Sequence, residues 1–206
     1  LLLLVALASP APARLGAAEQ RMIQTVDREQ QRTVAFLEKL VNQNSGTLNL
    51  EGVQAVAGMV RAELEPLGFE ARWIPMKETG RAGHLVATHR GPPTGSGGLG
   101  KRMLLIGHLD TVFEPDSPFQ RFERQGNRAT GPGIGDDKGG IAVIVAALRA
   151  MNAAGSLKNA GIVAHGVALK PGKPICLAVE HGKPVVVLPG FPTSAIFTFH
   201  EFVAPV

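Results

Sequence analysis

Two glycine-containing blocks constrain the fold of this chain more than any other feature. The first, residues 107–112, follows residues 102–106, a short apolar run with the pattern of a buried strand. The second, residues 131–140, is a glycine-rich turn that leads into residues 141–148, an apolar run typical of a buried helix. This order predicts an α/β fold in which the first block lies at the carboxyl end of a strand, where sites form in open α/β sheets.

Three residues in these blocks have the chemistry of a metal site: His108, Asp110 and Asp136. A neutral imidazole and a carboxylate are good zinc ligands. A histidine ligand also needs a second group that fixes its tautomer and orientation. Asp110 lies two residues after His108 and is placed to do this, or to shape the end of the strand. The glycines allow the backbone to approach a small charged centre closely.

These blocks allow two other interpretations. The glycine content of the second block also suits a phosphate-binding loop, but Asp136 and Asp137 place two adjacent negative charges where the phosphate would bind. Alternatively, His108 and the aspartates only cap the ends of the strand and the helix. The combination of H-x-D after a strand and G-x-G-x-x-D-D-K-G-G before a helix favours the metal site over both.

Together the two blocks resemble the signature of the co-catalytic di-zinc metallopeptidases, the family of aminoacylase, acetylornithine deacetylase, succinyl-diaminopimelate desuccinylase and glutamate carboxypeptidase. The resemblance covers residues from about 20 to about 160. It implies that His108 binds one zinc ion, that Asp136 bridges two, and that Asp110 is the catalytic residue that orients His108. It also implies a mixed sheet with flanking helices, and a small peptide or an N-acyl amino acid as substrate.

The same family takes its general base from a Glu-Glu or Glu-Asp pair on the next strand, and the second acid of that pair is a zinc ligand. Residues 161–174 of this chain read GIVAHGVALKPGKP and contain no acidic pair. A metal-bound water needs a base to take its proton. The sequence therefore predicts an incomplete zinc site and a chain with little or no hydrolase activity.

The tail carries a separate pattern, with K-P-G-K-P at residues 170–174 and L-P-G-F-P-T-S-A at residues 188–195. A strand, a Gly/Pro turn and a Ser or Thr at a helix start form an anion-binding corner. The tail resembles the C-terminal part of the molybdenum-inserting domain of molybdopterin molybdenumtransferases, although Phe191 and Thr193 depart from its usual Asn and Val. The resemblance implies a short βα unit that binds molybdopterin, with Mg²⁺ in the complete enzyme, through Lys170, Lys173, Pro189, Gly190, Pro192 and Ser194. The alternative is that both turns only shape a βα unit.

The start of the chain suggests export. Residues 1–18 combine an apolar run and small residues as a secretory signal peptide does, and the run is too short to span a membrane. We therefore expect a signal-peptide remnant at residues 1–18, the N-terminal part of a di-zinc peptidase domain at residues 19–160 and a molybdenumtransferase-like fragment at residues 161–206. The first segment predicts a periplasmic or secreted protein, whereas a molybdenum-cofactor function would place it in the cytoplasm. A non-functional chimeric product is a further possibility.

Charge and cysteine content exclude some other functions. The net charge of +4 is diffuse, with no Lys/Arg run longer than two residues, so nucleic-acid binding is not expected. The single cysteine, Cys176, cannot form an internal disulfide and is expected to be a structural thiol. The apolar content of 45% is enough for a core. Nothing in the sequence indicates an oligomeric state.

Overall fold

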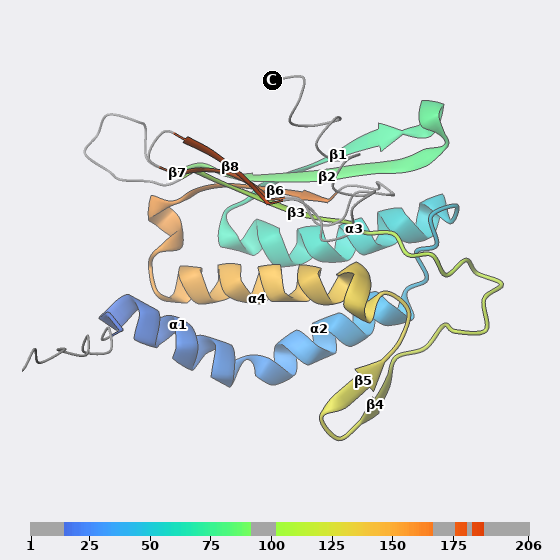
Figure 1. Cartoon of the computed structure of the whole chain (residues 1–206), viewed down its shortest axis with the longest axis horizontal. Coiled ribbons are helices and arrows are strands. Elements are labelled where there is room, and N and C mark those ends of the chain that lie inside the picture. The colour runs from blue at the N-terminus through green and yellow to red at the C-terminus, as the bar shows by residue number, and fades with distance from the viewer. Residues whose placement is uncertain (1–14, 92–101, 167–175, 181–182, 188–206) are drawn as a thin grey trace, which may run out of the picture.

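The computed structural model describes residues 15–91, 102–166, 176–180 and 183–187. Its centre is a six-stranded sheet in the order β1-β2-β6-β3-β7-β8 (Figure 1). The strands are β1 (Glu70–Met76), β2 (Arg81–His89), β3 (Arg102–Gly107), β6 (Gly161–Gly166), β7 (Cys176–Glu180) and β8 (Lys183–Val187). β3 and β6 are parallel, and the other neighbouring pairs are antiparallel. The predicted α/β fold with a mixed sheet is confirmed.

The α-helices lie on one side of this sheet in two layers (Figure 1). α3 (Leu50–Leu64) and α4 (Gly139–Ala153) pack against the sheet, and α1 (Ala17–Arg28) and α2 (Gln30–Asn42) pack against the far side of α4. α4 is therefore a central helix with neighbours on both sides. This explains why its sequence is apolar with little alternation, as expected for a buried helix.

The first two helices are separated at Glu29, whereas the sequence pattern predicts one helix over residues 20–42. Glu29 has φ −97° and ψ 9°, outside helical geometry. The break places Glu29 beside Arg149 of α4, where the two side chains form an ion pair at 3.4 Å. Ile23 and Val26, which the single-helix pattern places on a buried stripe, are each 48% exposed.

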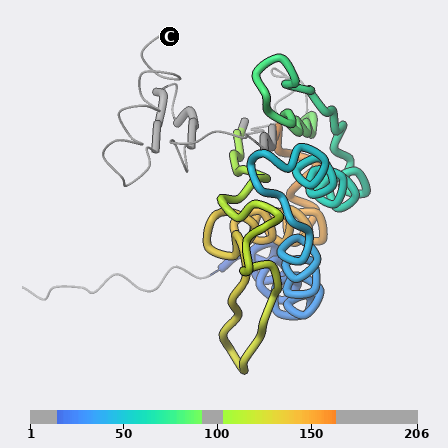
Figure 2. The backbone as a smooth tube through the Cα atoms, turned by 90° about the vertical axis from the view of Figure 1, so that its right-hand side faces the viewer, coloured from blue at the N-terminus to red at the C-terminus, as the bar shows by residue number. Residues whose placement is uncertain are grey.

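Two further elements differ in detail from the pattern. Residues 51–67 carry apolar residues at helical spacing, which predicts one helix, and they form α3 followed by a 3₁₀ turn, η1 (Glu65–Leu67). Gly68 ends it with φ 87°, a left-handed conformation that glycine adopts readily, as predicted. The sequence of residues 122–130 predicts a short, polar strand, but these residues form a hairpin of β4 (Glu123–Gln125) and β5 (Arg128–Thr130), because a tight turn reverses the chain between them. This hairpin projects from the layered body (Figure 2).

The core lies between the sheet and the helices and anchors both sequence blocks. Its fully buried side chains come from several elements and include Leu40, Val56, Val145 and Leu157. Leu109, between His108 and Asp110, belongs to the same cluster, as does Ile141 at the start of α4. The site is thus attached to the rigid centre of the domain at two points.

Several predictions concern residues outside the described ranges. Residues 1–14 of the expected signal segment lie outside them, and α1 begins at Ala17. The six tail residues from Lys170 to Ser194 also lie outside them. β6, which follows the predicted boundary at residue 160, pairs with both β2 and β3, and the boundary itself stays a prediction. In the described part of the chain, no helix has the length and apolarity needed to cross a membrane.

Candidate metal centre

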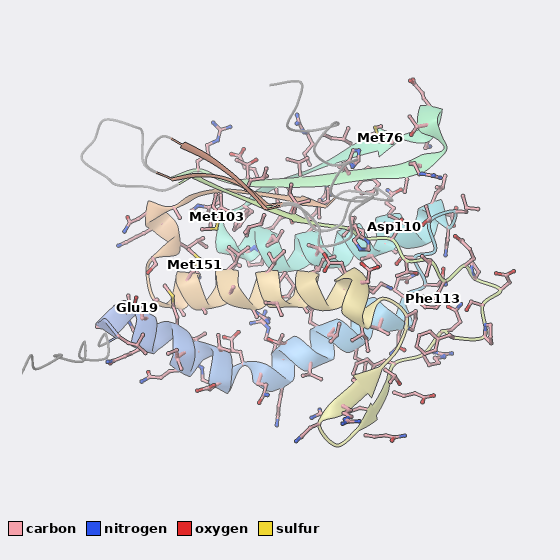
Figure 3. The ribbon with its side chains drawn as sticks, viewed as in Figure 1. Glu19, Met76, Met103, Asp110, Phe113 and Met151 are labelled. Carbon is pink, nitrogen blue, oxygen red and sulfur yellow. The ribbon has the colours of Figure 1, made fainter. Side chains whose placement is uncertain are left out.

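The structure brings His108, Asp110 and Asp136 together at the carboxyl end of β3. The His108 side chain is buried, and its Nδ1 lies 2.8 Å from the backbone oxygen of Asp110 and 3.2 Å from Asp110 Oδ1. On the other side of the ring, Nε2 lies 2.9 Å from Asp136 Oδ1. Figure 3 shows Asp110 at the end of the molecule where α4 begins.

Both ring nitrogens of His108 face oxygen atoms. The two oxygens beside Nδ1 favour a proton on that nitrogen, and in the neutral ring Nε2 then presents its lone pair to Asp136. A lone pair and a carboxylate oxygen 2.9 Å apart repel each other unless a proton or a metal ion lies between them. Two ligand atoms on one tetrahedral zinc ion lie roughly 3.3 Å apart, close to this separation. His108 and Asp136 therefore fit as two ligands of one metal ion.

Asp136 belongs to a short turn, η3 (Ile134–Lys138), that leads into α4. Asp136 and Asp137 have non-helical dihedral angles and are joined by a cis peptide bond. The side chain of Asp136 is 63% exposed, whereas that of His108 is 5% exposed. His108 is thus fixed in the core, whereas the Asp136 side chain lies at the surface, where a solute can reach it.

The glycines of the two blocks make room for Asp137. A Cβ atom at Gly140 would lie 2.1 Å from Asp137 Oδ1, and one at Gly107 would lie 2.9 Å from Asp137 Oδ2. Any side chain at Gly140 would therefore displace this carboxylate. This close packing gives a physical reason for glycine at positions 107 and 140, one in each block, while the predicted close approach of the backbone to a metal ion stays a prediction.

Lys138, the last residue of the turn, is fully buried. Its Nζ donates a hydrogen bond of 2.8 Å to the carbonyl oxygen of Gln43, which follows α2. The bond ties the Asp136 turn to the end of α2. Burial lowers the pKa of Lys138 from its ordinary value of 10.5 to about 8. Sequence reasoning gave Lys138 no role, because its partner lies 95 positions away.

This depressed pKa makes a prediction about stability and pH. Between about pH 8 and 10.5 the unfolded chain keeps the Lys138 proton while the folded chain has lost it, so the free energy of unfolding rises with pH. A Lys138→Met variant lacks this group. We expect the wild type to gain up to about 3 kcal/mol over Lys138→Met between pH 8 and 10.5. Urea unfolding of both proteins at several pH values measures the difference, and a constant difference would contradict the depressed pKa.

A segment between α2 and α3, residues 44–49, crosses the end of β3 and was missed by sequence reasoning. Its backbone exchanges hydrogen bonds with Thr111: Thr111 N donates to Ser45 O (2.8 Å), and Thr47 N donates to Thr111 O (3.0 Å). Thr47 Oγ1 also donates to Asp110 Oδ2 at 2.7 Å, and Asp110 is only 3% exposed. Asp110 thus lies between a histidine and a threonine hydroxyl.

The described residues do not supply a complete set of zinc ligands. Among the described residues, no group of three or more His, Cys, Asp or Glu side chains is arranged to hold a metal ion. Catalytic zinc sites usually have three protein ligands. β6 runs parallel to β3, and Gly166 pairs with Gly107, so β6 ends beside His108. The residues that follow it are Val167, Ala168 and Leu169, none of which can bind a metal.

The fold and the site define the class of this protein. It is an α/β protein with a His/Asp pair of metal-ligand type at the carboxyl end of a central strand. Residues 104–167 match the model of peptidase family M20/M25/M40. Residues 143–206 match the model described as "Probable molybdopterin binding domain". The two matches overlap over residues 143–167.

Comparison with individual proteins agrees with the first match. Carboxypeptidase G2 of Pseudomonas sp. (strain RS-16) is 38% identical over 130 residues, which are 62% of this chain and 30% of that protein. The fold is similar to human carnosine dipeptidase 1 (TM-score 0.61, 18% identity, 78% of this chain and 36% of that one). It is also similar to the di-peptidase Dug1p of Saccharomyces cerevisiae (TM-score 0.58, 16% identity, 71% and 34%).

Residues 104–167 thus match peptidase family M20/M25/M40, a family of zinc-using metallopeptidases, and the chain is similar to carboxypeptidase G2. Both resemblances found in the sequence, to the di-zinc peptidases and to the molybdopterin proteins, are confirmed by these matches. The chain spans about a third of the length of the relatives it matches.

Proposed function

We propose that this chain carries part of the zinc site of a metallopeptidase or amidohydrolase of the carboxypeptidase or N-acyl-amino-acid deacylase type. The observation that carries the proposal is the 2.9 Å approach of His108 Nε2 to Asp136 Oδ1 at the end of β3. Peptide substrates are typical of the family, and carboxypeptidase G2 is the relative with substantial identity. Export of the protein, proposed from residues 1–18, agrees with a hydrolase that acts on external substrates.

In this proposal each of the three residues has a distinct role. His108 offers the lone pair of Nε2, because Asp110 holds the proton on Nδ1. Asp136 adds a negative charge from the solvent-facing side. A zinc ion held by the pair supplies a Lewis acid and a water of lowered pKa. Asp110, which is buried, orients the imidazole and stabilises positive charge on it.

We further propose that the chain on its own hydrolyses N-acyl amino acids and peptides little or not at all. No carboxylate follows β6 at the position where the family has its general base, and a general base contributes about 10²–10⁴-fold to a rate. We expect the purified chain in the presence of zinc to be no faster than Asp136→Ala on an N-acyl amino acid and on a dipeptide. Zinc-dependent hydrolysis that disappears in Asp136→Ala would refute the proposed inactivity and would support the proposed peptidase chemistry.

A second candidate function, molybdopterin binding as in a molybdenumtransferase, is favoured by the match of residues 143–206. Its proposed residues lie outside the described ranges, and they are Lys170, Lys173, Pro189, Gly190, Pro192 and Ser194. Direct binding of molybdopterin to the purified chain is its test, with Lys173→Ala as the variant that should lose it. Absence of both zinc and molybdopterin binding would favour the third possibility, a chimeric product without either function.

A further inference from the structure

We propose that Thr47 is a positioning residue of the candidate metal centre, and that it acts through Asp110 on His108. The proposal rests on the proposed function in one respect, the role of His108 as a metal ligand. It adds a residue that no feature of the local sequence indicates, because Thr47 and Asp110 are 63 positions apart.

The hydroxyl of Thr47 has two acceptors within reach. Oγ1 lies 2.7 Å from Asp110 Oδ2 and 3.2 Å from the backbone oxygen of Thr111. A hydroxyl has one proton, and the shorter contact is with the charged acceptor, so the proton points to Asp110. Asp110 is almost fully buried, and a buried carboxylate that loses a donor is destabilised and reorients toward other donors.

The other oxygen of the same carboxylate faces the histidine. Asp110 Oδ1 lies 3.2 Å from His108 Nδ1, while Oδ2 accepts the proton of Thr47. The Thr47 contact therefore sets the rotation of the carboxylate about its Cβ–Cγ bond, and with it the position of Oδ1 against the imidazole. Since the opposite ring nitrogen of His108 points at Asp136, this chain of contacts runs from Thr47 to the metal-binding atoms.

The backbone, rather than the hydroxyl, holds Thr47 in this place. Backbone hydrogen bonds join Thr111 to Ser45, before Thr47, and to Thr47 itself. After Thr47, Leu48 N donates to Glu114 Oε1 at 3.1 Å. Gly46 packs so closely that a Cβ atom there would lie 2.8 Å from Glu114 Cα. A change of the hydroxyl alone should therefore leave the segment docked. Thr47→Val, which has the same shape, isolates the loss of the hydrogen bond.

The test compares Thr47→Val with Thr47→Ser, which keeps the hydroxyl. The matched control is Thr79→Val in the exposed turn η2 (Lys77–Thr79), where the hydroxyl bonds only locally to Met76 O at 2.8 Å. One readout is the ¹⁵N NMR spectrum of the His108 imidazole in the metal-free chain. The other is the affinity for Zn²⁺, measured by competition with a chromogenic chelator. Loss of a group that orients a metal-bound histidine typically weakens metal binding by about 10–100-fold.

We expect Thr47→Val to shift the His108 imidazole signals and to weaken zinc binding by about 10–100-fold, while Thr47→Ser and Thr79→Val resemble the wild type. Wild-type His108 signals in Thr47→Val would overturn the proposal. If the wild type binds no zinc, the proposed function fails, and the NMR comparison still decides the role of Thr47. If Thr47→Val does not fold, Thr47→Ala takes its place, since it removes the hydroxyl without a methyl group beside Asp110.

Discussion

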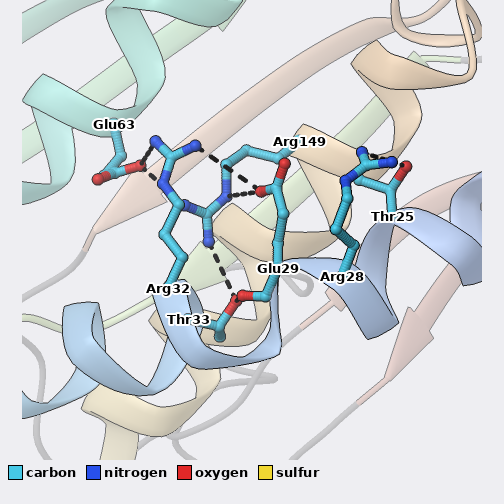
Figure 4. A network of polar contacts seen from close by, with 7 residues as sticks. All are labelled: Thr25, Arg28, Glu29, Arg32, Thr33, Glu63 and Arg149. Atoms are coloured by element: carbon cyan, nitrogen blue, oxygen red, sulfur yellow. Dashed lines mark hydrogen bonds and ion pairs between the residues drawn. The ribbon is translucent and has the colours of Figure 1, made fainter.

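Replacement of Arg149 by methionine is expected to lower the free energy of unfolding by about 3 kcal/mol. Arg149 projects from α4 and is 5% exposed. Its Nη1 lies 3.2 Å from Glu63 Oε2, and its Nη2 donates to Thr33 Oγ1 at 3.1 Å (Figure 4). Removal of one partner from a buried ion pair leaves an uncompensated charge, which costs about 3–5 kcal/mol. Because the side chain of Glu63 is 22% exposed, we expect the lower end of this range.

The contact between Arg149 and Glu29 contributes less to the expected loss in the free energy of unfolding. Arg149 Nε lies 3.4 Å from Glu29 Oε2, but neither atom satisfies hydrogen-bond geometry, so the pair interacts by charge alone. Its importance is its position, since Glu29 is the residue at which α1 ends and α2 begins. Together the contacts of Arg149 join α4 to α2, α3 and this junction. Arg149→Met should therefore loosen the packing of three helices.

Arg32→Met is the matched control for this prediction. Arg32 contacts the same carboxylate oxygen, Glu63 Oε2, at 3.0 Å, but its side chain is 57% exposed. Exposed ion pairs contribute about 0–1 kcal/mol, so this variant should lie within 1 kcal/mol of the wild type. Urea unfolding followed by the fluorescence of the single tryptophan, Trp73, measures all three proteins. Equal losses in Arg149→Met and Arg32→Met would show that burial adds nothing to the network.

The proximity of His108 and Asp136 could be predicted from sequence because each residue stands at the end of a local element. His108 follows the apolar run of β3, and Asp136 precedes the apolar run of α4, so the pattern alone places both near one edge of the sheet. Parallel pairing of β3 with β6 and the packing of α4 on β3 then bring the two residues together. For residues at the ends of such elements, the local periodicity of the sequence is sufficient to predict where they lie in the fold.

The supporting contacts could not be predicted in this way. Thr47 reaches Asp110 over 63 positions, and Lys138 reaches Gln43 over 95. Glu29, at the break between α1 and α2, pairs with Arg149, which is also far away in the chain. Thr47 does not stand out in its local sequence, and although Lys138 belongs to the second glycine-rich block, nothing near it indicates Gln43 as its partner. Their roles appear only when the fold brings their partners to them.

The position of β6 bears on how the two family matches relate. Both matches include residues 161–166, and this strand lies between β2 and β3. It completes the part of the sheet that supports His108, because it pairs with β3 along its whole length. A chain that contains β6 can therefore form the His108 end of the site even though residues 167–174, directly after the strand, include no acid. The strand pairing that builds this part of the fold does not require an acidic residue after β6.

Replacement of Asp136 by alanine is expected to weaken zinc binding by at least about 100-fold, equal to about 2.7 kcal/mol. Among the described residues no third His, Cys, Asp or Glu side chain forms a metal-binding group with His108 and Asp136, and Asp136 supplies the negative charge of this proposed pair. Removal of a charged ligand from a site with so few leaves His108 alone, and one neutral imidazole binds zinc weakly. Because the side chain of Asp136 is 63% exposed, stability without zinc should change by less than about 1 kcal/mol.

Asp116→Ala is the control for the loss of charge. Asp116 is an exposed acid in the loop between β3 and β4, so this variant changes the net charge by the same amount outside the site. Zinc should raise the melting temperature of the wild type and of Asp116→Ala but not that of Asp136→Ala, since a ligand that binds only the folded state stabilises it. Equal zinc affinity in all three proteins would mean that the 2.9 Å approach of His108 to Asp136 is an ordinary hydrogen bond. A loss confined to Asp136→Ala would assign the gap between these two side chains to a metal ion.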